Sequence, residues 1–413
     1  MRNRRIFKLF LLLTVCSLLI AGGYLWGFRH LPPPIQAATL DQAISLGSEY
    51  LVTACNADGK FVYRININPM VHPEPKYNML RHAGTLYALS QYEQRKPNKT
   101  TRDTVKRAAG LLHRAIRPLP DSPNMLAVWS FPEMTGSKNG VQLKLGGTGL
   151  GLVALLSVES ILPGTTSLDD LRQLGRFLVF MQKEDGSFYS KYFPEGGRNE
   201  EWTSLYYPGE AALGLLLLYE HDPDPLWLRT AVRTIAYLAR KRAQQSFVEA
   251  DHWIVLATAK LFSFQRERTQ SLPRGLFLRH AAQICESILA QRVQLEPGTA
   301  HYGCFSDDGL TCPTATRLEG LLAALTFLPS DYDDLRERIT TAVHQGIGFL
   351  LRAQLRAGPY PGGITRAIQP LPLSHPKFSS SFNRRATEIR IDYVQHAISA
   401  MLQYRQMFLS NYE

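Results

Sequence analysis

Cysteines, basic clusters and phosphate-binding motifs are scarce in this sequence of 413 residues. Each of these shortages argues against one class of ligand or partner. There are five cysteines and no CxxC or Cys/His cluster, so we expect neither a metal nor a cofactor. No block of Lys and Arg and no run of basic and aromatic residues is present, which argues against nucleic acid as a partner. The glycine-rich segment 146–151 lacks the context of a phosphate loop, so we interpret it as a site of close helix packing.

The five cysteines fall into three groups. Cys16 lies in the apolar N-terminal run, and Cys55 and Cys285 lie in helix-like segments, where core positions are expected. Cys304 and Cys312 flank a short loop and form a candidate disulfide in an oxidising compartment. Two free thiols are the alternative.

An uncharged run of eighteen residues, 9–26, follows four basic residues within positions 2–8. A bilayer core requires about 20 apolar residues, with a lower limit of about 17. The excess of positive charge before the run predicts a cytoplasmic N-terminus. We therefore expect a cytoplasmic basic stub (1–8), a transmembrane signal-anchor (9–28) and a proline-rich stalk (29–38), with residues 39–413 periplasmic or extracellular. A cleaved signal peptide is the alternative, although residues 35–38 are a poor cleavage site.

The formal charge of +11 falls to +6 once the five basic residues before position 30 are set aside. The body of the chain is therefore moderately basic, which suits an acidic polymer or an anionic membrane surface.

Helical patterns follow one another without an intervening linker, which predicts a single all-α domain. Apolar residues recur at three- and four-residue spacing in most of these segments. The twelve predicted helices make six pairs: 40–55, 76–94, 102–116, 146–161, 168–183, 207–220, 225–243, 250–265, 275–292, 314–327, 333–355 and 390–408.

Three helices end in a glycine turn with an aromatic residue two positions later: Gly59 with Phe61, Gly186 with Phe188, and Gly358 with Tyr360. The segment 182–188, QKEDGSF, is similar to the Q-x-x-D-G-x-W/F signature of terpene-cyclase-like toroids. This resemblance implies a closed (α/α)6 ring of six inner and six outer helices. An open helical solenoid is the alternative, but solenoid repeats are commonly about 33–47 residues and regular, whereas these pairs span roughly 50–75.

In such a ring, the loops that enter the inner helices meet at one end and form a pocket. Most of the expected inner helices begin with ionisable or aromatic polar residues. The catalytic candidates are Glu210, Asp251, His82, Tyr207 and Asp392. The candidates for substrate binding are Arg81, Tyr77, Tyr206, His252, Trp253, Arg317, Glu319, Arg390 and His396. Helix capping and hydrogen-bonded core histidines are the competing interpretations.

Two reactions fit these candidates. Glu210 and Asp251, from neighbouring inner helices, would supply the two carboxylates of a glycoside hydrolase. Tyr207, His82 and Arg81 would instead suit lysis or epimerisation of a uronic acid, in which a base removes the proton beside a carboxylate that an arginine neutralises.

The chain resembles the six-hairpin toroids that include many glycosidases, and the helical domain of glucuronyl C5-epimerases. This resemblance implies a long polar cleft and a polysaccharide or oligosaccharide partner, possibly an acidic one. We therefore expect a membrane-anchored extracytoplasmic enzyme acting on an envelope or exported polysaccharide. A non-catalytic polysaccharide-binding or assembly protein is the alternative. An isoprenoid cyclase is disfavoured, because the D-x-D-D motif is absent.

Overall fold

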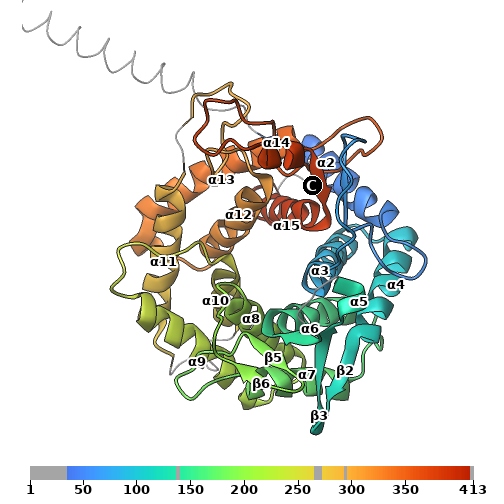
Figure 1. The fold of residues 1–413 in the computed structure, drawn as a ribbon. Coiled ribbons are helices and arrows are strands. Elements are labelled where there is room, and N and C mark those ends of the chain that lie inside the picture. The colour runs from blue at the N-terminus through green and yellow to red at the C-terminus, as the bar shows by residue number, and fades with distance from the viewer. Residues whose placement is uncertain (1–34, 136–139, 265–271, 293–294, 410–413) are drawn as a thin grey trace, which may run out of the picture.

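Two concentric rings of helices make up the computed structural model, which describes residues 35–135, 140–264, 272–292 and 295–409 (Figure 1). The inner ring consists of α3 (Met79–Arg95), α6 (Leu145–Glu159), α8 (Tyr207–His221), α10 (His252–Ser263), α12 (Thr311–Leu325) and α15 (Ile391–Phe408). The outer ring consists of α2 (Ala37–Thr53), α4 (Lys99–Ala115), α7 (Leu168–Phe180), α9 (Pro225–Arg242), α11 (Arg274–Ala290) and α13 (Asp333–Ala353).

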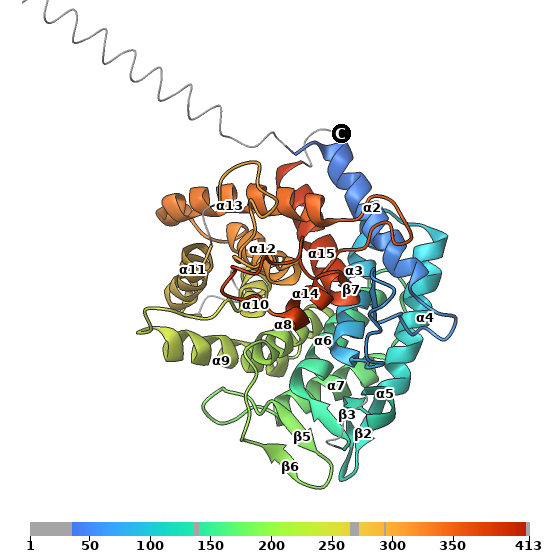
Figure 2. The ribbon, with the colours of Figure 1, turned by 45° about the horizontal axis from the view of Figure 1, so that its top comes forward.

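The inner ring is closed. Each inner helix packs against the next one in the chain, and α15 packs against α3, the first. The outer helix α2 covers α15, so the two ends of the domain meet (Figures 1 and 2). The predicted (α/α)6 toroid is therefore confirmed, and the open solenoid is excluded.

Glycines let the inner helices approach closely. A side chain at Gly149 of α6 would collide with the backbone of α8 at Ala211, and one at Gly209 would collide with the backbone of α10 at Trp253 and Ile254. Nearly every residue of α6 is buried, as expected for a helix enclosed on all sides. The glycine-rich segment 146–151 thus serves helix packing, as the sequence predicts.

The outer helices are amphipathic. In α7, Leu171, Leu174, Phe177 and Leu178 are buried, and Ser167 caps the helix by accepting a hydrogen bond from the backbone N–H of Asp170.

The glycine turns join neighbouring helix pairs. Gly59 and Gly186 have positive φ angles of 87° and 92°, and they pack against the backbone of α4 and α9 respectively. The aromatic residues that follow them, Phe61 and Phe188, are buried. In the third turn, Gly358 also has a positive φ, but the glycine that packs on an outer helix is Gly362, against α2.

Small sheets and short helices occupy the connecting segments, so the expectation of an all-α fold is too simple. One sheet has the order β2-β3-β4-β5-β6 and the other pairs β1 with β7, with all neighbours antiparallel. The strands are β1 (Arg64–Asn66), β2 (Ile116–Leu119), β3 (Ser122–Ser130), β4 (Gln142–Lys144), β5 (Lys191–Phe193), β6 (Gly197–Asn199) and β7 (Glu388–Arg390). The short helices are α5 (Pro132–Thr135), α14 (Ser380–Ala386) and the 3-10 turn η2 (Ser330–Tyr332). Most of these strands have three residues, which is too short for an alternating pattern to be recognised.

The predicted anchor at 9–28 lies outside the described residues. Within the described part of the chain, no helix is both long enough and apolar enough to span a bilayer.

Candidate functional site

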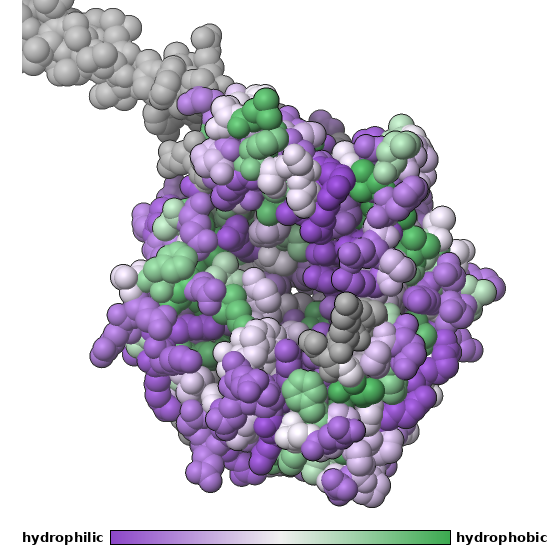
Figure 3. Space-filling view, viewed as in Figure 1, coloured by the Kyte–Doolittle hydropathy of each residue, from purple (hydrophilic) through white to green (hydrophobic). Residues whose placement is uncertain are grey.

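A pocket opens where the inner helices begin, and the face of the ring seen in Figure 3 is hollowed at its centre. Its volume is about 250 Å³, and all six inner helices contribute to its lining. Nine of the fourteen candidate side chains line it: Arg81, Tyr206, Glu210, His252, Trp253, Arg317, Arg390, Asp392 and His396. This volume suits one end of a saccharide, and the expected long cleft remains a prediction.

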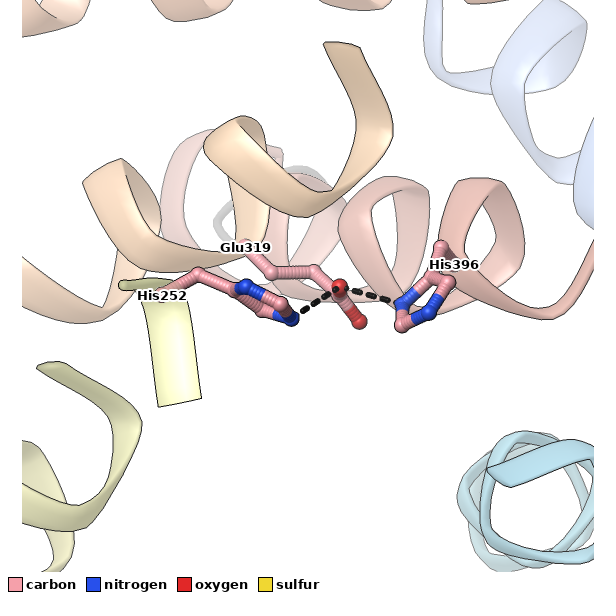
Figure 4. Close-up of side chains that lie close together, drawn as sticks. All are labelled: His252, Glu319 and His396. Carbon is pink, nitrogen blue, oxygen red and sulfur yellow. Dashed lines mark hydrogen bonds and ion pairs between the residues drawn. The ribbon is translucent and has the colours of Figure 1, made fainter. Parts of the chain in front are cut away.

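Two histidines of the pocket lining, His252 and His396, lie on either side of Glu319, which is buried and is not itself part of the lining (Figure 4). Glu319 of α12 lies between His252 of α10 and His396 of α15. Its Oε2 atom is 2.7 Å from Nδ1 of His396 and 3.9 Å from Nε2 of His252. The centroids of the two imidazole rings are 5.7 Å apart.

His252 is buried, and neither of its ring nitrogens has a hydrogen-bond partner within the described residues. Burial and the nearby His396 lower its pKa well below the usual value, so its imidazole is neutral. A neutral, unpartnered imidazole facing a pocket can accept a proton from a bound molecule.

His396 has the opposite tendency. Burial alone would lower its pKa, but the charge of Glu319 and its hydrogen bond outweigh burial and raise it. The Glu319–His396 pair therefore retains a proton near neutral pH. The two imidazoles are thus driven toward different protonation states, the arrangement expected of an acid and a base.

The same three residues could hold a metal ion, because one ligand atom from each lies within 4.8 Å of the others. Histidine and carboxylate ligands suit a zinc-like ion. The expectation of no metal remains a prediction.

Two arginines hold Asp392 at the side of the pocket. Arg81 donates to its Oδ2 atom at 2.8 Å, and Arg390 makes two hydrogen bonds to the carboxylate at 2.5 and 2.9 Å. Burial would raise the pKa of Asp392, but these arginines outweigh burial and lower it. Asp392 is therefore an ionised anchor for the arginines rather than an acid.

Glu210 is the buried acid of the pocket. Its Oε2 atom has no hydrogen-bond partner within the described residues. Burial, with a contribution from Asp251, raises its pKa well above the usual value. The protonated form of Glu210 is therefore favoured, and this form can donate a hydrogen bond to a ligand.

Asp251, the expected opposite carboxylate, does not line the pocket. It is fully buried, caps α10 through the backbone N–H of Ile254, and pairs with Arg242 of α9 at 3.0 Å. Glu210 and Asp251 therefore do not face each other across the pocket as hydrolysis requires.

His82 and Tyr77 also lie outside the pocket lining. The Tyr77 hydroxyl contacts Nδ1 of His82 at 2.8 Å, and Nε2 of His82 contacts the carbonyl of Ala108 at 2.9 Å. Tyr77 also accepts a hydrogen bond from the backbone N–H of Phe61. These contacts join α3 to α4 and to the first glycine turn, so both side chains have structural partners.

Tyr207 lies behind the pocket, at the start of α8. Its ring contacts Trp202 edge-on, and it packs beside Gly146 of α6.

The four cysteines among the described residues, Cys55, Cys285, Cys304 and Cys312, are free thiols. The Cys304 thiol lies 3.3 Å from the hydroxyl of Thr314, and Cys312 lines the pocket in the first turn of α12. Of the two alternatives for Cys304 and Cys312, the structure therefore has the two free thiols.

Sequence reasoning missed Gln395 and Thr316 among the polar residues of the lining. Gln395 precedes His396 and accepts a hydrogen bond from Thr85 of α3, so it ties the two ends of the inner ring together. Its position beside a candidate histidine is the signal that could have identified it.

Solved structures share this architecture at low sequence identity. A cellobiose 2-epimerase from Bacillus thermoamylovorans is 11% identical, with a TM-score of 0.63 over 90% of this chain and 100% of its own. A D-mannose isomerase is 10% identical, with a TM-score of 0.60 over 90% and 98%. The fold is the six-hairpin α/α toroid. An inactive variant of an α-1,6-mannanase from Salegentibacter, in complex with mannotriose, is 12% identical, with a TM-score of 0.57 over 88% and 98%. No family model and no curated protein matches the sequence.

Proposed function

We propose that this chain is a carbohydrate-active enzyme that epimerises or isomerises a sugar by proton transfer. The observation that carries the proposal is the pair of imidazoles on either side of Glu319, one neutral and one protonated, in a pocket the size of a sugar. Similar folds occur in a cellobiose 2-epimerase and a D-mannose isomerase, which supports this reaction class.

The proposed reaction begins at the carbon beside the carbonyl of a ring-opened sugar. Neutral His252 removes the proton from this carbon, and the electron pair of the C–H bond moves toward the carbonyl oxygen to give an enediolate. The His396 imidazolium then returns a proton to carbon and becomes neutral. Return to the same carbon with inversion gives an epimer, and return to the former carbonyl carbon, with proton transfer between the oxygens, gives an isomer.

Glu319 has a role in resetting the site. After one turnover His252 carries a proton and His396 lacks one. Because Glu319 lies between them, it can pass a proton from His252 to His396. Neutral Glu210 and the Arg81–Asp392–Arg390 cluster offer hydrogen bonds to the sugar hydroxyl groups and to the developing enediolate.

Hydrolysis is less well supported. It requires two carboxyl groups with distinct roles around the scissile bond. Asp251 is absent from the lining and Asp392 is held by two arginines, which leaves Glu210 alone.

The test uses the full-length protein in detergent, incubated in ²H₂O with reducing mono- and disaccharides, with and without uronic acid units. Nuclear magnetic resonance should show deuterium at the carbon beside the carbonyl and no shortening of the saccharide. New reducing ends would show hydrolysis instead. Binding with neither result would favour the non-catalytic alternative.

The location of the domain is also a proposal. The apolar run at 9–26 and the basic residues before it support a single-pass anchor in the cytoplasmic membrane with the toroid outside. Protease added to intact spheroplasts should digest the toroid domain. The mass of the purified chain distinguishes an uncleaved anchor from a cleaved signal peptide.

A further inference from the structure

A pair of lysines lies beside the pocket, on the small sheet that leads into α6. Lys144 of β4 and Lys191 of β5 are direct partners in the antiparallel register. Like charges directly opposite each other on neighbouring strands are destabilising. Neither lysine has a carboxylate partner within the described residues. Lys144 also precedes the first residue of α6, where the helix dipole disfavours a positive charge.

The positive charge of Lys144 is close enough to an arginine of the pocket lining to interact with it. Lys144 is half-buried, and burial, then Lys191 and Arg81, lower its pKa. Arg81 itself lines the pocket and shares Asp392 with Arg390. Lys144 is therefore within electrostatic reach of Arg81, which connects the lysine pair to the arginine side of the pocket.

An aromatic surface accompanies the lysines. The Lys191 ammonium lies 4.5 Å from the centre of the Trp202 ring, and Trp202 contacts Tyr207 at a centroid distance of 5.6 Å. Trp202 is 42% exposed and Tyr206, which lines the pocket, is 39% exposed, although both are large aromatic side chains. Exposed aromatic rings offer flat apolar faces on which a sugar ring can stack.

We propose that Lys144, Lys191 and Trp202 form a subsite for an acidic sugar unit adjoining the reacting sugar. The carboxylate or sulfate of that unit binds between the two ammonium groups, and its ring packs against the exposed part of Trp202 that Lys191 does not cover. The neighbouring sugar enters the pocket past Arg81. This inference rests on the proposed function for the identity of the ligand as a saccharide, and it narrows the substrate to an anionic oligosaccharide.

Repulsion between the lysines is relieved when an anion binds between them. In the free protein the repulsion between the two positive charges destabilises the fold, and a bound anion removes this repulsion. Anionic groups therefore gain affinity here that neutral sugars do not, and this gain falls as salt screens the charges beyond a Debye length of about 8 Å at physiological ionic strength.

The test measures binding rather than turnover, by Trp fluorescence and calorimetry on the full-length protein. The probes are cellotetraose, its C6-oxidised counterpart and its 6-O-sulfated counterpart. The acidic probes should bind about tenfold more tightly than the neutral one, as expected for charge-assisted contacts, and high salt should reduce the difference. Preference for the oxidised or for the sulfated probe identifies which anion the subsite takes.

The variants Lys144→Met and Lys191→Met keep the length of the side chain and remove the charge. Each should reduce the preference for acidic probes and leave the affinity for cellotetraose unchanged. Trp202→Ala should weaken binding of all three probes. Lys241→Met is the matched control, because this lysine also lies over an aromatic ring, Tyr237, but on the outer helix α9.

Equal affinity for neutral and acidic probes, or a preference that survives in the Lys144→Met/Lys191→Met double variant, would overturn the subsite. The absence of binding by any probe would overturn it as well. Acidic preference without deuterium exchange in ²H₂O would refute the proposed reaction and leave the subsite standing.

Discussion

His82 and His252 occupy similar places in the fold but differ in their hydrogen bonds. Both are buried histidines near the start of an inner helix, and both follow a charged residue in the sequence. Both nitrogens of His82 have partners, on Tyr77 and Ala108, whereas neither nitrogen of His252 has one. The comparison shows that satisfaction of hydrogen bonds, rather than residue type or burial, separates a structural histidine from one available to a ligand.

The largest expected effect is on catalysis by His252→Asn. Loss of the base should reduce the rate of deuterium exchange by about 10²- to 10⁴-fold. Thermal unfolding should show no loss of stability, because the imidazole has no hydrogen bond to lose. His82→Asn is the matched control and should retain exchange per folded molecule. Exchange within a few-fold of the parent in His252→Asn would contradict the assignment of the base.

The carboxylates allow the same comparison. Asp251→Asn should destabilise the protein by about 3–5 kcal/mol, since it leaves Arg242 as an unpaired charge that is mostly buried. Exchange per folded molecule should be nearly unchanged. Denaturant unfolding measures the first effect, and the double variant with Arg242→Met should recover part of the lost stability. If Asp251→Asn instead abolished activity at unchanged stability, the result would support a catalytic role for Asp251.

A smaller effect is expected for His82→Leu. It removes the partner of the Tyr77 hydroxyl and of the Ala108 carbonyl, which should cost about 1–3 kcal/mol. Chemical denaturation with an unchanged m-value would measure this loss. Adding Tyr77→Phe should cause a further loss, because it also removes the acceptor of the Phe61 backbone N–H. Equal stability of His82→Leu and the parent would show that these contacts are not structural.

The pH dependence of stability should reveal a property that His82 and His252 share, which is a lowered pKa. Burial lowers the pKa of His82 to about 4, and that of His252 is also lowered. Between pH 6.5 and pH 4 the unfolded chain takes up a proton at His82 while the folded chain does not. Stability attributable to this group is therefore complete above pH 6.5 and falls by about 1.4 kcal/mol per pH unit below it.

The measurement is the difference in unfolding free energy between the parent and His82→Leu across this window. The difference should shrink as the pH falls, because the variant lacks the group that takes up the proton. Activity should respond differently, since neutral His252 and protonated His396 are both required. The rate should decline at a pH well below 6.5, where His252 is protonated, and again above 6.5, where His396 loses its proton. A difference that does not vary with pH would show that His82 is not held neutral.

Much of the helical architecture could be predicted from the sequence, because each long helix has its own apolar periodicity. The starts of the inner helices, and with them most of the pocket lining, follow from that periodicity. The periodicity does not predict whether Glu210 or Asp251 faces the pocket. That outcome depends on Arg242, a residue of a different helix that pairs with Asp251. The same holds for His82, whose partner Ala108 is 26 residues away in the sequence.

The small sheets could not be predicted either. Pairs such as Arg64 with Arg390 join strands of three residues from opposite ends of the chain, and no local pattern specifies them. The lysine pair of β4 and β5 became visible only through this strand register.

Closure of the ring by α15 has a consequence for synthesis. His396, Asp392 and Arg390 belong to the last stretch of the domain to leave the ribosome, yet their partners Glu319 and Arg81 are made earlier. The inner ring therefore cannot close until α15 has been made. Contacts between residues this distant in sequence form late in folding. A chain released before α15 would lack both the acid and the arginine anchor. The complete pocket lining therefore requires that α15 has been made.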